Sequence, residues 1–223
     1  MQLYCKNKAM NIGVLGGTFD PIHIGHLILA EEARIKLGMS EVLFVPAGQP
    51  WLKEDRSITP ATHRVEMVRR AIATNPYFKL CLIEVERSGP SYTVDTITML
   101  REQLGAEASL FFILGHDSLA DLPLWKEPNK LVQICRLVVA PRLSSNVIAS
   151  EAWQSHFRSD LKSLAESIPG VTDNVIQLDM PVIEISSSEI RERVAQGLSI
   201  RYLVPEGVEE YIAEQKIYLA SAS

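Results

Sequence analysis

The sequence predicts an α/β protein with a Rossmann-like open parallel sheet and helices on both faces of that sheet. Three observations support this fold class. Short apolar runs alternate along the chain with segments of helical periodicity. The first apolar run leads through the glycine pair Gly16 and Gly17 into the first helical segment. With 223 residues, of which 47% are hydrophobic, the chain can bury one sizeable core.

Six apolar runs and four helical segments make up this pattern. The runs predict strands at residues 11–15, 41–45, 79–85, 109–114 and 137–140, with a weaker strand at 175–178. Helices are expected at 24–37, 61–74 and 94–104, because a glycine follows the first and the third and Pro76 follows the second. Residues 150–167 are expected to form an amphipathic helix outside the alternation, after a loop around 144–146.

The domain organisation expected from this pattern is simple. Residues 1–10 form an N-terminal extension, and residues 11–223 form a single domain. Its last part, from about 186 to 223, is small and helical.

The charge and the cysteine content exclude several classes of protein. A net charge of −5 argues against nonspecific binding to nucleic acid or to an anionic membrane. Three widely spaced cysteines indicate neither a disulfide framework nor a metal cluster, and we expect no protein metal site. No apolar signal core and no run of about 18 apolar residues is present, so we expect a cytoplasmic protein. The composition leaves open whether the chain forms a homo-oligomer.

The segment 16–26, Gly-Gly-Thr-Phe-Asp-Pro-Ile-His-Ile-Gly-His, is the most informative motif. Its glycines allow close approach of the backbone to a bulky anion, and the helix start that follows offers N–H donors. His23 and His26 are three residues apart and share one face of that helix start, where imidazole can donate to phosphoryl oxygens. A glycine turn or a single histidine is by itself usually structural, but the combination after a strand favours a nucleotide phosphate site. The order of residues differs from the Gly-x-Gly-x-x-Gly dinucleotide fingerprint.

Further candidate residues follow the other strands, because ligands collect at the carboxyl edge of a parallel sheet. After the second strand, a loop rich in proline and glycine ends in the cation Lys53. After the third strand, Thr93 either contacts a ligand or caps the next helix. After the fourth strand, Asp117 either binds a ribose or caps a short helix, and Trp125 either stacks on a flat ring or fills the core.

The second motif is Ile-Ser-Ser-Ser-Glu-Ile-Arg at residues 185–191. Ser186 is the expected N-cap of a helix, and Glu189 completes a capping box flanked by an apolar pair. Capping does not explain Arg191 or the consecutive hydroxyls at the positive end of the helix, which suit a polyphosphate. We interpret the motif as a capped helix whose start binds phosphate.

The two motifs resemble the paired motifs of the nucleotidyltransferase superfamily, which also contains the class I aminoacyl-tRNA synthetases. Over most of the chain the wider pattern resembles the bacterial nicotinate-nucleotide adenylyltransferase family. Thr93 with Trp125 points to the nicotinate nucleotide within the superfamily. The pattern includes His63-Arg64 and the segments 91–96 (SYTVDT), 115–117 (GHD), 122–125 (LPLW) and 200–205 (IRYLVP).

The resemblance implies a reaction of NAD biosynthesis in which the phosphate of nicotinate mononucleotide attacks the α-phosphorus of ATP. The products are nicotinate adenine dinucleotide and pyrophosphate, and Mg²⁺ accompanies the ATP. The implied catalytic residues are His23, His26, Lys53 and Arg191. The implied ATP-binding residues are Gly16, Gly17, Thr18, Phe19, His23, Gly25, His26, Gly115, Asp117, Ser187, Ser188 and Arg191. The residues implied to bind the nicotinate nucleotide are Asp20, Lys53, Thr93, Trp125 and Lys126.

The sequence departs from the family pattern at two places. Relatives commonly carry Pro-Pro-His before a cation in the second loop, whereas Trp51 and Leu52 precede Lys53 in this chain. His116 stands where a small residue is usual, and the resemblance implies no role for it.

Several alternative functions stay open at this stage. An adenylyltransferase for another phosphomonoester, such as phosphopantetheine or nicotinamide mononucleotide, would use the same chemistry. A tRNA synthetase fragment would require a Lys-Met-Ser-Lys-Ser-like loop and a basic RNA-binding module, and the sequence has neither. A non-catalytic nucleotide sensor would have little need for two histidines and two cations.

Overall fold

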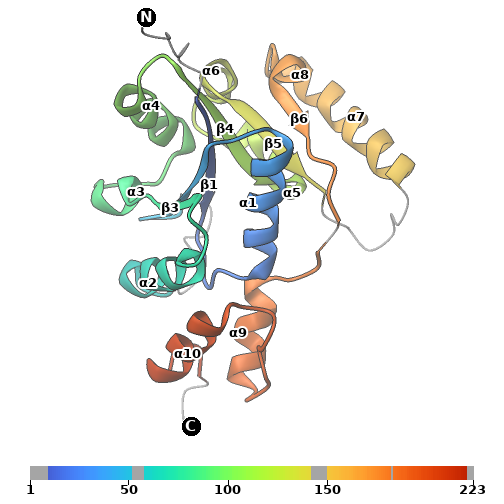
Figure 1. The fold of residues 1–223 in the computed structure, drawn as a ribbon. Coiled ribbons are helices and arrows are strands. Elements are labelled where there is room, and N and C mark those ends of the chain that lie inside the picture. The colour runs from blue at the N-terminus through green and yellow to red at the C-terminus, as the bar shows by residue number, and fades with distance from the viewer. Residues whose placement is uncertain (1–9, 52–57, 142–149, 182, 220–223) are drawn as a thin grey trace, which may run out of the picture.

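A computed structural model describes residues 10–51, 58–141, 150–181 and 183–219 of the chain. Its centre is a six-stranded sheet in the order β3-β2-β1-β4-β5-β6, with every neighbouring pair parallel (Figure 1). The Rossmann-like fold class is confirmed. The strands are β1 (Met10–Gly17), β2 (Glu41–Pro46), β3 (Phe78–Leu80), β4 (Ala108–Gly115), β5 (Arg136–Ala140) and β6 (Val175–Gln177).

The strand order reverses its direction at β1. The chain forms β1, β2 and β3 towards one edge of the sheet and then returns to place β4 on the other side of β1. Leu15 of β1 therefore pairs with Phe44 of β2 and with Ile113 of β4. In open α/β sheets ligands bind at such a reversal, outside the carboxyl ends of the strands.

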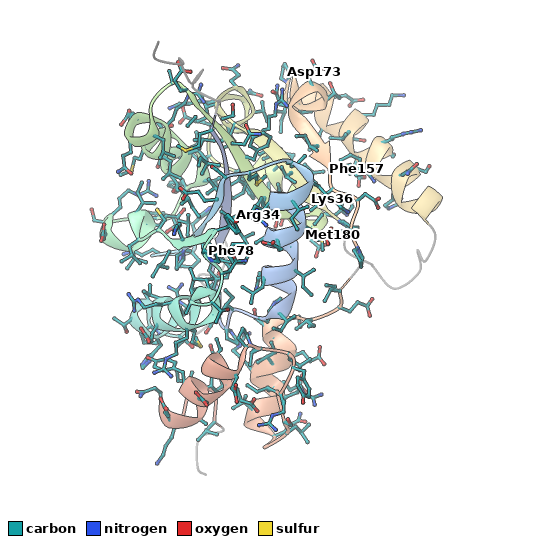
Figure 2. All side chains as sticks on the ribbon, in the orientation of Figure 1. Arg34, Lys36, Phe78, Phe157, Asp173 and Met180 are labelled. Atoms are coloured by element: carbon teal, nitrogen blue, oxygen red, sulfur yellow. The ribbon has the colours of Figure 1, made fainter. Side chains whose placement is uncertain are left out.

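Each face of the sheet carries its own hydrophobic core, because successive side chains of a strand point to opposite faces. Leu15 belongs to the first core, together with apolar residues of α1 and α2, whereas Val14 belongs to the second. Phe78 lies in the first core and Phe157 in the second (Figure 2). The helices of the first face are α1 (Ile24–Lys36) and α2 (Ala61–Ile72), and those of the second are α4 (Thr93–Leu104), α6 (Pro128–Ile134), α7 (Ser150–Ser167) and α8 (Val171–Asn174).

The last part of the described chain extends the first core beyond the sheet. Figure 1 shows α9 (Ser187–Ala195) and α10 (Glu206–Glu214) together at one end of the molecule, far from α7 and α8. Ile190 of α9 and Ile212 of α10 are buried in the same core as α2, and α10 packs against α2. The division into an extension and a single domain stays a prediction, and residues 1–9 lie outside the described part. Three short helical segments complete the fold: α3 (Ile83–Glu86), α5 (His116–Ala120) and the 3₁₀ turn η2 (Leu122–Leu124).

The strand expected at 79–85 is wrong over most of its length. Phe44 of β2 is the last residue that β3 pairs with, and after Cys81 donates to the Phe44 carbonyl the chain turns into α3. Ile83 and Glu84 are nevertheless buried, within a helical turn instead of a strand. Periodicity cannot separate a strand from a buried helical turn over so short a run.

One of the two interpretations of Thr93, that it caps α4, is also wrong. Tyr92 occupies the N-cap position, and Thr93 is the first helical residue. The other expected helices begin and end within two residues of their expected limits, whereas the loop around 144–146 lies outside the described residues. None of the described helices has the length and the apolar character needed to cross a bilayer.

Candidate active site

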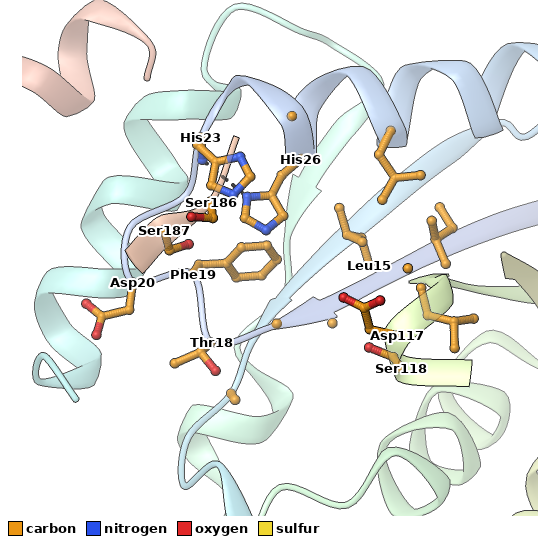
Figure 3. A pocket seen from close by; sticks show the side chains of 18 of the residues that line it. Leu15, Thr18, Phe19, Asp20, His23, His26, Asp117, Ser118, Ser186 and Ser187 are labelled. Atoms are coloured by element: carbon orange, nitrogen blue, oxygen red, sulfur yellow. Dashed lines mark hydrogen bonds between the residues drawn. The ribbon is translucent and has the colours of Figure 1, made fainter. Parts of the chain in front are cut away.

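A pocket of about 510 Å³ opens where the strand order reverses. Gly16 and Gly17 from the end of β1 and Gly115 from the end of β4 form part of its lining. Figure 3 shows the histidines and Phe19 on one side of this pocket and Asp117 with Ser118 on the other. The expected site residues that line it are Gly16, Gly17, Thr18, Phe19, Asp20, His23, Gly25, His26, Thr93, Gly115, Asp117, Trp125, Ser187, Ser188 and Arg191.

The two histidines of the first motif are held at the start of α1. His23 is the N-cap residue, and its backbone N–H donates to His26 Nδ1 at 3.2 Å. The two imidazole rings stack with 3.7 Å between their centroids. Phe19, whose φ of 50° lies in the left-handed region, turns its ring edge-on to His26 at 5.1 Å. The loop between β1 and α1 thus presents both rings to the pocket.

The second motif begins α9 and is joined directly to the first motif. Ser186 caps the helix by accepting the Glu189 N–H at 3.1 Å, as the sequence predicts. Ser187 Oγ donates to the Pro21 carbonyl at 2.9 Å, and Arg191 Nη1 donates to the Asp20 carbonyl at 2.7 Å. The second guanidinium nitrogen of Arg191 contacts a neighbouring serine hydroxyl at 3.3 Å. Two segments more than 160 residues apart in sequence therefore meet at one pocket.

Asp20 occupies a junction that sequence analysis did not anticipate. Its side chain is buried, and both carboxylate oxygens accept hydrogen bonds, from Tyr218 Oη at 2.6 Å and from the Thr59 N–H at 3.3 Å. Its carbonyl accepts from Arg191. Partners so far away in sequence leave no periodic signal that could have revealed them.

Arg64 is the other organising residue, and the sequence analysis named it only as part of the family pattern without a role. It is 1% exposed and donates to the carbonyls of Thr18 and Thr59 at 2.7 and 2.8 Å. Burial lowers the pKa of Arg64 from its usual value, and the nearby Asp20 carboxylate opposes that change. The sequence pattern could have revealed this role, because Arg64 is the one cation on the buried face of α2. It stands next to Val65 and one turn before Val68.

The other side of the pocket carries residues suited to a nucleoside and a flat ring. Gly115 is the N-cap residue of α5, and Asp117 lies in the first turn of that helix. Trp125 meets Phe112 edge-to-face with 5.9 Å between the ring centroids. The indole Nε1 of Trp125 is buried and has no partner among the described atoms. Thr93 completes this side at the start of α4.

Glu84 adds a buried carboxyl group to the same side of the pocket. It is 8% exposed, and Thr96 Oγ1 donates to its Oε1 at 2.7 Å. Burial raises the pKa of Glu84, although the hydrogen bonds from Thr96 and Ser91 oppose that change. Sequence analysis missed this residue because the strand expected there would not have placed it against the site.

Three sequence-based expectations concern residues outside this lining. Lys53 lies outside the described residues, as does Leu52. Lys126 is absent from the pocket lining, and its Nζ lies 3.0 Å from each carboxylate oxygen of Asp95. His116 Nε2 lies 2.7 Å from Asp160 Oδ2 on α7, so this hydrogen-bond contact joins α7 to the start of α5. In the part of the chain that the structure describes, no group of three histidine, cysteine or acidic residues could hold a metal ion.

The sheet is open and parallel, and its pocket lies where the strand order reverses. His23, His26 and Arg191 line this pocket. Together these features define an α/β protein of the nucleotidyltransferase type. The model of the cytidylyltransferase-like family matches residues 14–193. The chain belongs to this family and, within it, to the nicotinate-nucleotide adenylyltransferases, a group of nucleotidyltransferase enzymes of NAD biosynthesis.

Relatives of this chain carry the name "Probable nicotinate-nucleotide adenylyltransferase". The protein of Dehalococcoides mccartyi strain CBDB1 is 43% identical over 210 residues, which cover 94% of this chain and 98% of the relative. The protein of Thermomicrobium roseum is 46% identical over 207 residues, which cover 93% and 91%.

A solved structure shares the fold at lower sequence identity. The nicotinic acid mononucleotide adenylyltransferase of Plasmodium falciparum, complexed with NaAD, has a TM-score of 0.71 and 23% identity. The superposition covers 94% of this chain and 97% of that one.

Proposed function

We propose that the chain transfers the adenylyl group of ATP to nicotinate mononucleotide, with nicotinate adenine dinucleotide and pyrophosphate as products. The observation that carries the proposal is the convergence of both motifs on one pocket, through the Arg191 to Asp20 hydrogen bond. Membership of the nicotinate-nucleotide adenylyltransferases supports the choice of substrates.

The reaction is an in-line displacement at phosphorus. A phosphate oxygen of nicotinate mononucleotide forms a bond to the α-phosphorus of ATP while the bond from that phosphorus to the bridging oxygen of the β-phosphate breaks. The bridging oxygen keeps the electron pair and leaves with pyrophosphate. Such a transfer requires positioning and stabilisation of negative charge more than covalent catalysis.

The histidines suit the charge that develops on the transferred group. Because His26 Nδ1 accepts the His23 N–H, a neutral His26 ring carries its proton on Nε2. We infer that this Nε2–H donates to the phosphate oxygens, and that His23 contributes from the adjacent stacked ring. Gly16 and Gly17 allow the backbone to approach the same phosphates.

The start of α9 suits the pyrophosphate that leaves. The first N–H groups of a helix have no partner within the helix, and the helix dipole favours an anion there. Ser187 and Ser188 are the first two residues of α9, and Arg191 lies one turn further on the same side. We infer that these three residues bind the β- and γ-phosphates and retain them as the bond breaks.

The nucleoside side of the pocket suits the two rings. We propose that Asp117 and Gly115 face the ribose of the adenosine, and that Trp125 stacks on the pyridine ring near Thr93. Asp20 and Lys126 remain proposed contacts of the mononucleotide, although each already has protein partners. Lys53 is proposed to bind the phosphate of the mononucleotide.

Mg²⁺ is proposed to enter with ATP. Proteins usually bind Mg²⁺ through substrate phosphates, water molecules and one or two carboxylates. The ion would neutralise part of the triphosphate charge, while the histidines and Arg191 of this chain orient the phosphates.

The proposal is tested by incubating the purified protein with Mg²⁺, ATP and one acceptor at a time. The acceptors are nicotinate mononucleotide, nicotinamide mononucleotide and phosphopantetheine, and the measured quantity is the rate of pyrophosphate release. We expect the highest kcat/KM with nicotinate mononucleotide. An equal or higher kcat/KM with phosphopantetheine would contradict the assignment of nicotinate mononucleotide as the acceptor. ATP binding without turnover of any acceptor would contradict the proposal that the chain is an enzyme.

A further inference from the structure

The residue Tyr218, near the C-terminal end of the described chain, contacts Asp20, which lines the pocket. It follows α10 in a turn where Lys216 and Tyr218 have φ values of 52° and 66°. Ile217 between them is buried in the first core and anchors the turn. The phenol of Tyr218 thereby lies against the loop that carries the first motif.

Among the described residues, Tyr218 is the one side chain that donates a hydrogen bond to the Asp20 carboxylate. Tyr218 Oη donates to Asp20 Oδ1 at 2.6 Å, and the backbone N–H of Thr59 donates to Asp20 Oδ2 at 3.3 Å. Asp20 is 6% exposed, and a buried carboxylate is costly unless donors surround it. A short hydrogen bond to a charged acceptor is among the stronger hydrogen bonds in proteins. Tyr218 therefore contributes much of what keeps the Asp20 side chain in place.

The backbone of Asp20 transmits this restraint to the reactive groups. Its carbonyl accepts from Arg191, and it lies between Phe19, in the left-handed region, and the residues that lead to His23. A displaced Asp20 side chain would rotate the peptide that Arg191 binds. The same displacement would change the path of the chain into the N-cap of α1.

The phenol remains a donor under ordinary conditions. Burial raises the pKa of Tyr218, and the neighbouring Asp20 carboxylate raises it further. Arg64, which approaches the same loop, carries a compensating positive charge.

We propose that Tyr218 is a positioning residue for the reaction. It acts through Asp20 on Arg191 and on the two histidines. This inference rests on the proposed function where the test measures kcat, because that measurement requires the proposed reaction. The binding readout described below does not depend on the identity of the acceptor.

The chain offers a matched control for the test. Tyr211 also lies in the C-terminal helical part, is 9% exposed and forms one hydrogen bond through its phenol, with His63 Nδ1 at 2.9 Å. Neither tyrosine lines the pocket, but the Tyr211 ring contacts His63 and Arg70 rather than a residue of the first motif. Tyr218→Phe and Tyr211→Phe therefore each remove one phenolic oxygen from the same part of the molecule, but only the first touches Asp20.

We expect Tyr218→Phe to lower kcat about 10- to 100-fold, the range that follows from a small misplacement of reacting groups. The KM for nicotinate mononucleotide should change less than kcat, and the dissociation constant for ATP should rise. Tyr211→Phe should keep kcat within about twofold of the natural value. It should lower the unfolding temperature by about as much as Tyr218→Phe does, because each change removes one hydrogen-bonding phenol. Equal kcat values in the two variants, after correction for the folded fraction, would overturn the proposal.

A double-mutant cycle tests the route through Asp20. If Tyr218 acts through this carboxylate, Tyr218→Phe should lower kcat and ATP affinity much less in an Asp20→Ala background, which has no acceptor for the phenol, than in the natural chain. Additive effects would overturn the route. A natural chain that binds ATP but releases no pyrophosphate would instead contradict the proposed function, while the ATP affinities of the variants still decide the role of Tyr218.

Discussion

His26 contributes both to the helix and to the proposed chemistry. Its Nδ1 accepts the N–H of the N-cap residue His23, which stabilises the start of α1. The same bond selects the tautomer that places a donor on Nε2. Histidine is thus required at this position for two reasons, whereas another capping side chain would satisfy only the first.

Replacing His26 by alanine separates these two contributions. We expect kcat to fall about 100- to 1000-fold, as after removal of one donor to a developing negative charge. The lost cap should cost about 1 kcal/mol of the free energy of unfolding, so the variant remains folded. Steady-state kinetics and urea unfolding measure the two effects. Exposed His156 on α7 supplies the control, because His156→Ala should change neither quantity measurably.

Glu84 gives a pH dependence of stability whose sign follows from its burial. Burial raises the pKa of Glu84 above its ordinary value of 4.5, so the folded protein binds this proton more tightly than the unfolded chain. Its contribution to stability is complete below pH 4.5 and is lost as the pH rises through the folded-state pKa. Glutamine retains the acceptor for Thr96 without the titration.

We therefore expect the free energy of unfolding of Glu84→Gln, minus that of the natural chain, to increase as the pH rises. The measurement is the free energy of unfolding in urea at about pH 4 and about pH 8 for both proteins. Glu102→Gln, at an exposed position of α4, should show no comparable change between the two pH values. If the natural chain instead gained stability relative to Glu84→Gln as the pH rises, the result would contradict the expectation.

At the scale of elements, the long and strongly patterned segments could be predicted from the sequence. The helices α1 and α4 end near Gly38 and Gly105, and Ser186 caps α9, because these signals are local. The turn at α3 could not be predicted, because its conformation depends on packing against a loop from another strand connection. The closeness of residue 48 to α3 is the clearest sign of that packing.

Gly48 lies so close to α3 that a side chain does not fit. A Cβ built at this position would lie 2.1 Å from the carbonyl oxygen of Glu84, which is backbone and cannot move alone. We expect Gly48→Ala to lower the free energy of unfolding by at least about 2 kcal/mol, because overpacking forces the backbone to shift. Gly115→Ala is the control for stability, since a Cβ there meets no atom within 4 Å. Equal unfolding free energies of the two variants would contradict this account.

At the scale of the whole molecule, the strand order explains why the site could be located before its contacts were known. Ligands collect where a parallel sheet reverses its order, and both glycine-rich strand ends carry motif residues there. The hydrogen bonds that join the motifs could not be predicted, because Asp20 and Tyr218 are 198 residues apart and no pattern relates them. The sequence therefore predicts the location of the pocket but not the network that supports it.

Because ligands in this pocket would contact both sides of the reversal, binding should stabilise the entire fold. At about 100 times its dissociation constant, a ligand that binds only the folded state adds about 2.7 kcal/mol to the free energy of unfolding. We expect MgATP to raise the unfolding temperature in proportion, and CTP to raise it much less at equal concentration. Calorimetric scans with each nucleotide measure this, and equal stabilisation by CTP would contradict a preference for adenine.

The late position of α9 in the chain has a consequence for biosynthesis. A ribosome synthesises all six strands before it reaches Arg191, so every strand of the sheet is present in the growing polypeptide before this cation is added. A transcript cut short between β6 and α9 would encode a product that retains the glycine turn and both imidazoles but lacks the residues proposed to retain pyrophosphate. The proposed role of Arg191 therefore implies that catalytic competence is acquired at the end of translation rather than gradually along it.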